Sequence, residues 1–118
     1  MRENLLIDKS IAFAARIIKL HKHLIKTQKE TVISKQIVCS GTSIGANIHE
    51  AQYAQSKKDF VAKLEIALKE SNETSYWLKL MYETKRLDVA TYQHTEKLCG
   101  NIRRLLIASC KTAKENAK

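Results

Sequence analysis

Apolar residues recur at spacings of three and four along four successive stretches of this chain, with short polar connections between them. This spacing places the apolar residues on one side of an α-helix. The chain has no proline and only three glycines, a composition that favours helix over sheet. Because short links make neighbouring helices antiparallel, the pattern predicts an all-α fold. We expect residues 1–118 to form a single domain, an antiparallel up-down-up-down four-helix bundle.

The first predicted helix runs from about Asn4 to Lys26, with Asn4 or Asp8 as its N-terminal cap. It carries two parallel apolar stripes, and together they predict a wide face turned toward the core. The first stripe is Phe13, Ile17, Leu20 and Leu24, and the second is Ile11, Ala14, Ile18 and Ile25.

The second predicted helix spans about Thr31 to Tyr53 and is lined with small residues. Gly41 and Gly45 lie four apart on one side of it. Each costs about 0.5–1 kcal/mol relative to alanine within a helix, so a close approach of helices is the expected compensation. That approach could lie within the chain or between chains. Asn47 lies on or beside the apolar line and needs a hydrogen-bond partner if it is buried.

The third and fourth helices have clear start signals. The run Ser56-Lys57-Lys58-Asp59 resembles a capping box, and Asp88 is a good N-cap residue for the last helix. Leu64 and Leu78 lie on the predicted inward line of the third helix, and Leu106 lies on that of the fourth. We expect all three leucines to be buried.

The formal net charge is +9, and most of the excess lies in residues 1–30 and 87–118. A basic balance suits a polyanionic partner such as RNA or DNA, although it also suits a protein whose charge only keeps it soluble. Because antiparallel first and fourth helices are neighbours, their cations could merge into one surface. The candidate nucleic-acid-binding residues are Arg16, Lys19, Lys26, Arg103, Arg104, Lys111 and Lys114, with His23 beside them. With only seven aromatic residues in the chain, binding should depend on the phosphate backbone and have little sequence specificity.

The sequence offers little for chemistry. A dimetal bundle needs Glu-x-x-His pairs, and none is present. Cys99 and His94 lie five residues apart, a poor pairing on a helix for a nucleophile and its base. The three cysteines lack metal-ligand spacing and are expected to be reduced. We therefore expect no catalytic residues, no metal and no cofactor.

The central sequence resembles one known family. The run S-G-T-S-I-G-A-N-I-H-E-A, followed by S-K-K-D-F-V-A-K-L-E-I-A-L-K-E-S-N-E-T-S-Y-W-L, is similar to the bacterial 23S rRNA intervening-sequence proteins. The likeness covers nearly the whole chain. It implies an antiparallel bundle that assembles into a ring-like homopentamer. It also implies kinship with accessory proteins of diversity-generating retroelements, basic pentameric bundles that bind nucleic acid and a reverse transcriptase.

These observations lead to a functional hypothesis. The sequence predicts a non-enzymatic, homo-oligomeric bundle that binds RNA, DNA or a nucleic-acid-handling protein; Gly41, Gly45 and Asn47 are candidate packing or assembly residues. The alternative is a protein–protein adaptor or structural oligomer that binds no nucleic acid. Without a membrane-length apolar run or a secretory signal, we expect a cytoplasmic location.

Overall fold

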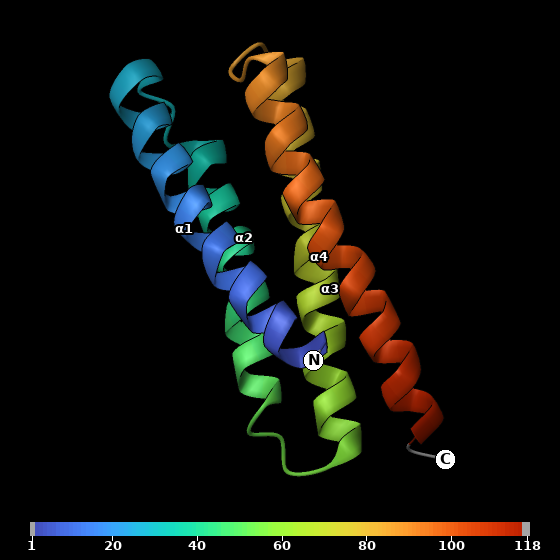
Figure 1. Ribbon diagram of the computed structural model, residues 1–118. Coiled ribbons are helices and arrows are strands. Elements are labelled where there is room, and N and C mark those ends of the chain that lie inside the picture. Colours follow the sequence, from blue (N-terminus) through green and yellow to red (C-terminus); the bar gives the residue numbers. More distant parts are fainter. Residues whose placement is uncertain (1, 117–118) are drawn as a thin grey trace.

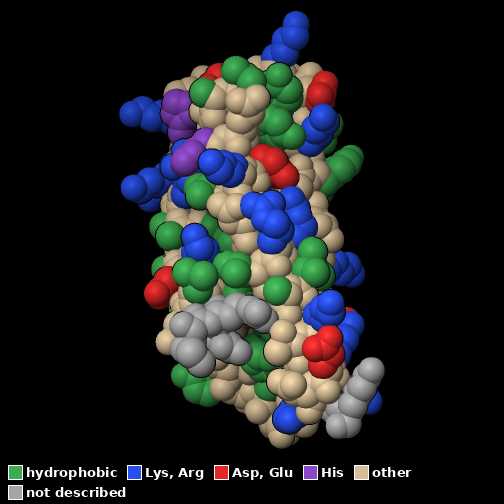
Figure 2. All heavy atoms as spheres, turned by 45° about the vertical axis from the view of Figure 1, so that its right-hand side comes forward, with side chains coloured by type: hydrophobic (Ala, Val, Ile, Leu, Met, Phe, Trp, Pro, Cys, Tyr) green, Lys and Arg blue, Asp and Glu red, His purple; other side chains and the backbone are tan. Residues whose placement is uncertain are grey.

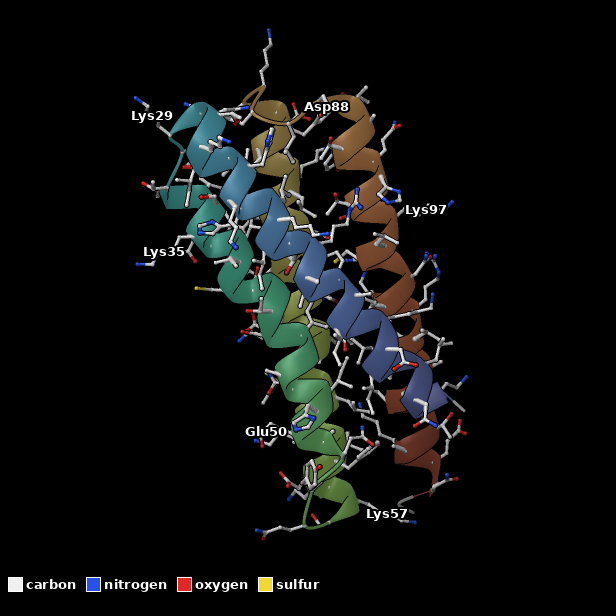
Figure 3. The ribbon with its side chains drawn as sticks, turned by 60° about the vertical axis from the view of Figure 1, so that its left-hand side comes forward. Lys29, Lys35, Glu50, Lys57, Asp88 and Lys97 are labelled. Carbon is white, nitrogen blue, oxygen red and sulfur yellow. The ribbon has the colours of Figure 1, made fainter. Side chains whose placement is uncertain are left out.

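The computed structural model describes residues 2–116, with side chains from Asn4 onward, and consists of four helices (Figure 1). They are α1 (Arg2–Gln28), α2 (Val32–Ala51), α3 (Lys57–Glu83) and α4 (Val89–Asn116). Each helix packs antiparallel against the next, and α4 returns beside α1. Lys29 and Asp88 mark one end of the bundle and Lys57 marks the other (Figure 3). The predicted four-helix bundle is confirmed, in a rod of 49 × 21 × 20 Å.

The core follows the predicted apolar lines. Leu64, Leu78 and Leu106 are each at most 1% exposed, as expected. Two buried hydroxyl groups form a hydrogen bond between helices, in which Thr74 Oγ1 of α3 donates to Ser40 Oγ of α2 at 2.9 Å. Ser40 Oγ in turn donates to the backbone oxygen of Gln36, so these buried polar atoms are satisfied. The hydrogen bond between α2 and α3 therefore lies among apolar side chains.

The helix starts confirm two predicted caps and correct a third. Ser56 Oγ accepts from the backbone N–H of Asp59 at 3.0 Å, and Asp88 accepts from that of Thr91 at 3.0 Å. The expected cap at Asn4 or Asp8 is wrong, because α1 already begins at Arg2. An acidic cap that the sequence reading missed opens α2, where Glu30 Oε1 accepts from the backbone N–H of Ile33 at 2.8 Å. A carboxylate there also complements the positive end of the helix dipole.

The second apolar stripe of α1 does not face the core. Ile11 is 63% exposed, Ile18 is 40% exposed and Ile25 is 38% exposed. The prediction of one wide inward face is therefore wrong for the single chain. The first stripe is buried, together with Leu6 and Ser10 of the same helix. The three isoleucines lie on a flank of α1 that is partly open to solvent.

Candidate nucleic-acid interface

A three-residue pattern repeats every seven residues along α1 and gives the helix two different flanks. It is Lys9-Ser10-Ile11, then Arg16-Ile17-Ile18, then His23-Leu24-Ile25. The middle residue of each triplet is buried, and the isoleucine after it is exposed. Lys9 and Arg16 line a groove against α4, and His23 lines the hollow beside the start of α4. Successive residues lie about 100° apart around a helix, so a cationic flank and an apolar flank border the same buried line.

The α1–α4 groove has a volume of about 390 Å³. Its floor is apolar and is formed by Ala12, Phe13, Ala15, Leu98 and Ile102. Its polar lining consists of Lys9, Arg16 and Lys19 from α1 and Asn101 from α4. Every charged residue in this lining is a cation. Figure 2 shows Lys and Arg side chains alternating with hydrophobic patches on the face over α1 and α4.

Arg103 does not point into this groove. Its side chain is 23% exposed and turns toward α3, where Nη1 donates to Ser75 Oγ at 2.7 Å. Its Nη2 pairs with Glu96 Oε2 at 3.1 Å. Contact with a phosphate would have to compete with these partly buried bonds. Arg103 thus acts first as a link between α4 and α3.

The remaining predicted cations differ in their exposure and in their bonding partners. Arg104 is exposed and donates to Asn101 Oδ1, but it lines a separate hollow on α4 with Glu96 and Arg103. Lys114 is paired with Glu65 of α3 at 2.9 Å, and this carboxylate raises the pKa of the lysine. Lys26 and Lys111 are exposed. Of the predicted residues, Arg16 and Lys19 line the groove, and Arg104 contacts the groove residue Asn101.

The glycine pair serves contact within the chain. A Cβ added at Gly41 would lie 3.0 Å from Ile17 Cγ1, and one added at Gly45 would lie 3.3 Å from Ser10 Oγ. Both glycines therefore let α2 lie close against α1. Asn47 is half-buried, and its Nδ2 donates to the backbone oxygen of Ser43 within α2 at 2.8 Å.

Two groove residues were missed as site residues. Lys9 precedes Arg16 by seven residues, so heptad spacing could have placed it on the same flank. Asn101 had no comparable signal, because nothing in its local sequence shows which helix it faces. Its position in the groove depends on the packing of α4 against α1.

The environment of Cys99 does not suggest a nucleophile. Cys99 is fully buried, and burial raises the pKa of its thiol to about 11. Its Sγ donates to the backbone oxygen of Ser71 at 3.4 Å. Among the described side chains, no three His, Cys, Asp or Glu residues gather as metal ligands would. Within residues 2–116, no helix combines the length and apolarity that crossing a bilayer requires.

The fold and this surface define a class, a four-helix bundle with one strongly cationic helix flank. Residues 2–108 match the 23S rRNA-intervening sequence protein family, and the chain belongs to that family. The fold is similar to a crystal structure of a protein with unknown function from the S23 ribosomal protein family of Bacteroides thetaiotaomicron. The two share 51% identity with a TM-score of 0.93, and the match covers 94% of this chain and 99% of that one. No curated protein matches the chain.

Proposed function

We propose that this protein is a non-enzymatic, homo-oligomeric bundle that binds the phosphate backbone of RNA or DNA through the cationic flank of α1. The observation that carries the proposal is the α1–α4 groove, whose charged lining residues Lys9, Arg16 and Lys19 are all cations. Arg104 extends this surface onto α4. Lys26 and Lys111 are exposed cations farther along the same two helices. The alternative, an adaptor or structural oligomer, requires that this charge only keeps the protein soluble.

Electrostatics favours a polyanion over a small anion as the ligand. The cations from Lys9 to Lys19 extend over about 15 Å of helix, a length that suits a chain of phosphates. Each phosphate neutralised releases condensed counterions, and this release supplies most of the non-specific binding energy. A single subunit should therefore bind with modest affinity.

The apolar flank of α1 supports self-association, which would multiply that affinity. Ile11, Ile18 and Ile25 form an exposed row on the other side of the buried line from Lys9 and Arg16. Covering this row with another subunit would leave the cationic flank free. We propose the homopentamer that the family resemblance implies. In such a ring, each further subunit would meet the same nucleic acid at a high effective concentration.

Salt-dependent binding tests the proposal. We expect filter-binding or fluorescence anisotropy to show retention of structured RNA and duplex DNA at about 50 mM salt, with a steep loss toward 200 mM. The double variant Arg16→Glu/Lys19→Glu should bind both more weakly. It should also reduce the salt slope by about one for each lost phosphate contact.

The matched control is Lys35→Glu/Lys58→Glu, which changes the net charge equally at exposed positions on α2 and α3. It should retain most of the affinity. If neither nucleic acid is retained at about 50 mM salt, the adaptor hypothesis replaces this one. Equal losses in the two variants would show a response to net charge alone and would rule out this surface.

A further inference from the structure

We propose that the α1–α4 groove accepts an unpaired nucleobase while Lys9, Arg16 and Lys19 hold the phosphates beside it. The preferred ligand is therefore a single-stranded or looped segment rather than a continuous duplex. This inference rests on the proposed nucleic-acid binding and narrows its ligand.

The floor of the groove supplies the first argument. A surface built only for phosphates needs no apolar hollow, yet this one is lined by Ala12, Ala15 and Leu98, with the buried Phe13 and Ile102 behind them. In a duplex, stacking and pairing keep the bases away from such a floor. In loops and single strands, the base faces are free to pack against protein. The apolar floor thus distinguishes the two kinds of ligand.

The groove also has a suitable size. Its volume of about 390 Å³ lies within the range of about 300–1,000 Å³ that small-molecule sites occupy. The space depends on Ala12 and Ala15, because a longer side chain at either position on α1 would fill it. Of the four packed seams of the bundle, the one between α1 and α4 has the sparsest backbone contact.

The two sides of the groove would contact different parts of a nucleotide. The α1 side carries the three cations, which suit phosphates, and the α4 side carries Asn101, which suits a base. Asn101 Oδ1 accepts a hydrogen bond from Arg104. The Nδ2 group of Asn101 would therefore be the group that donates to an acceptor on the edge of a base. A single amide contact permits several bases, so the site should prefer unpaired nucleotides without strong sequence specificity.

Abasic oligonucleotides separate base binding from phosphate binding. We expect a single-stranded oligo-dT to bind about tenfold more tightly than an abasic strand of the same length at about 100 mM salt, because both carry the same phosphates. It should also bind more tightly than a duplex with the same number of phosphates. Equal affinities for oligo-dT and the abasic strand would overturn the inference.

Filling the groove provides the second test. Ala12→Leu and Ala15→Leu keep every cation and change exposed positions, with exposed Ala62→Leu on α3 as the matched control. The two groove variants should lower oligo-dT affinity by about tenfold and leave the affinity for the abasic strand unchanged. The control should change neither affinity. Thermal melting identifies any variant that fails to fold, and the abasic comparison on the unaltered protein remains decisive in that case.

The outcomes also separate this inference from the proposed function. If no nucleic acid is retained at about 50 mM salt, both fail. If duplex and single strands bind equally and the groove variants behave as the control does, only the base site fails. If instead an acidic amphipathic peptide binds and only the groove variants abolish its binding, the groove is a protein-docking site and the inference is overturned.

Discussion

Arg103 and Arg104 are neighbours in the sequence of α4, but their side chains lie in different surroundings and have different roles. Arg103 bonds to Ser75 and Glu96 in a partly buried cluster between α3 and α4. Arg104 is exposed, and its bond is to Asn101 of its own helix. Glu96 would lose its ion-pair partner if Arg103 were removed. Arg103 therefore has a structural role between α3 and α4, whereas Arg104 contributes charge to the surface.

Replacing each arginine by glutamine should give different stabilities. Arg103→Gln should lower the free energy of unfolding by about 1–3 kcal/mol, because it breaks a charge-assisted hydrogen bond and leaves a half-buried carboxylate without its cation. Arg104→Gln should change it by less than about 0.5 kcal/mol. Urea denaturation of the two variants measures the difference. Equal stabilities would show that the Arg103 cluster contributes no net stability.

At the scale of the helix, the glycines differ in what surrounds them. Gly41 is buried against Ile17 of α1, where an added Cβ would lie 3.0 Å from that side chain. Gly100 of α4 is covered only by arginine side chains, with a would-be Cβ 3.5 Å from Arg103 Nη2. The same substitution therefore meets a packed core at one position and only ordinary van der Waals contacts with two arginine side chains at the other.

Gly41→Ala and Gly100→Ala should shift stability in opposite directions. At Gly41 the added methyl group would lie 3.0 Å from the side chain of the fully buried Ile17. We expect overpacking to cost about 1–3 kcal/mol. At Gly100 the higher helix propensity of alanine should stabilise by about 0.5–1 kcal/mol. Thermal unfolding followed by circular dichroism compares them. A higher melting temperature for Gly41→Ala would show that Ile17 can move to accept the added methyl group.

The cap of α4 predicts a pH-dependent effect. Hydrogen bonds from the hydroxyl and backbone N–H of Thr91 lower the pKa of Asp88. Because the carboxyl is more acidic in the folded state, its stabilisation is complete above its unfolded pKa and is lost as the pH falls through its folded pKa. Asp88→Ala should thus be less stable than the unaltered protein at about pH 7, with a smaller difference at about pH 3. A difference that stays constant across this range would contradict the cap.

At the scale of the whole molecule, the exposed row on α1 is an unusual feature for an isolated bundle. Three isoleucines at heptad spacing border the buried line of a helix that already packs against α2 and α4. Heptad rows of this kind form helix–helix seams when a partner covers them. A further subunit is the partner we propose, and it would give the first helix contacts on three sides.

The assembly prediction follows from that row. We expect light scattering at tens of micromolar to give a pentamer, and Ile18→Glu to shift it toward monomer. A charge placed in an apolar seam loses hydration without gaining a partner. Ile66→Glu on α3 is the control of matched exposure, at 41% against 40% for Ile18. If the unaltered protein is a monomer, the proposed assembly is wrong. If Ile18→Glu still forms a pentamer, the interface does not include the isoleucine row.

The sequence by itself determined the four helices, their caps at Ser56 and Asp88 and the buried leucines. These features depend on apolar periodicity and on side chains that bond to backbone a few residues away. Lys9, Arg16 and Ile18 could likewise be placed around α1 relative to one another. The period of a helix does not fix its rotation against its neighbours or which neighbour lies on each flank. Only the tertiary structure decided that Arg103 faces α3, that a groove lies over Ala12 and that Ile18 is exposed. These features depend on how all four helices pack together.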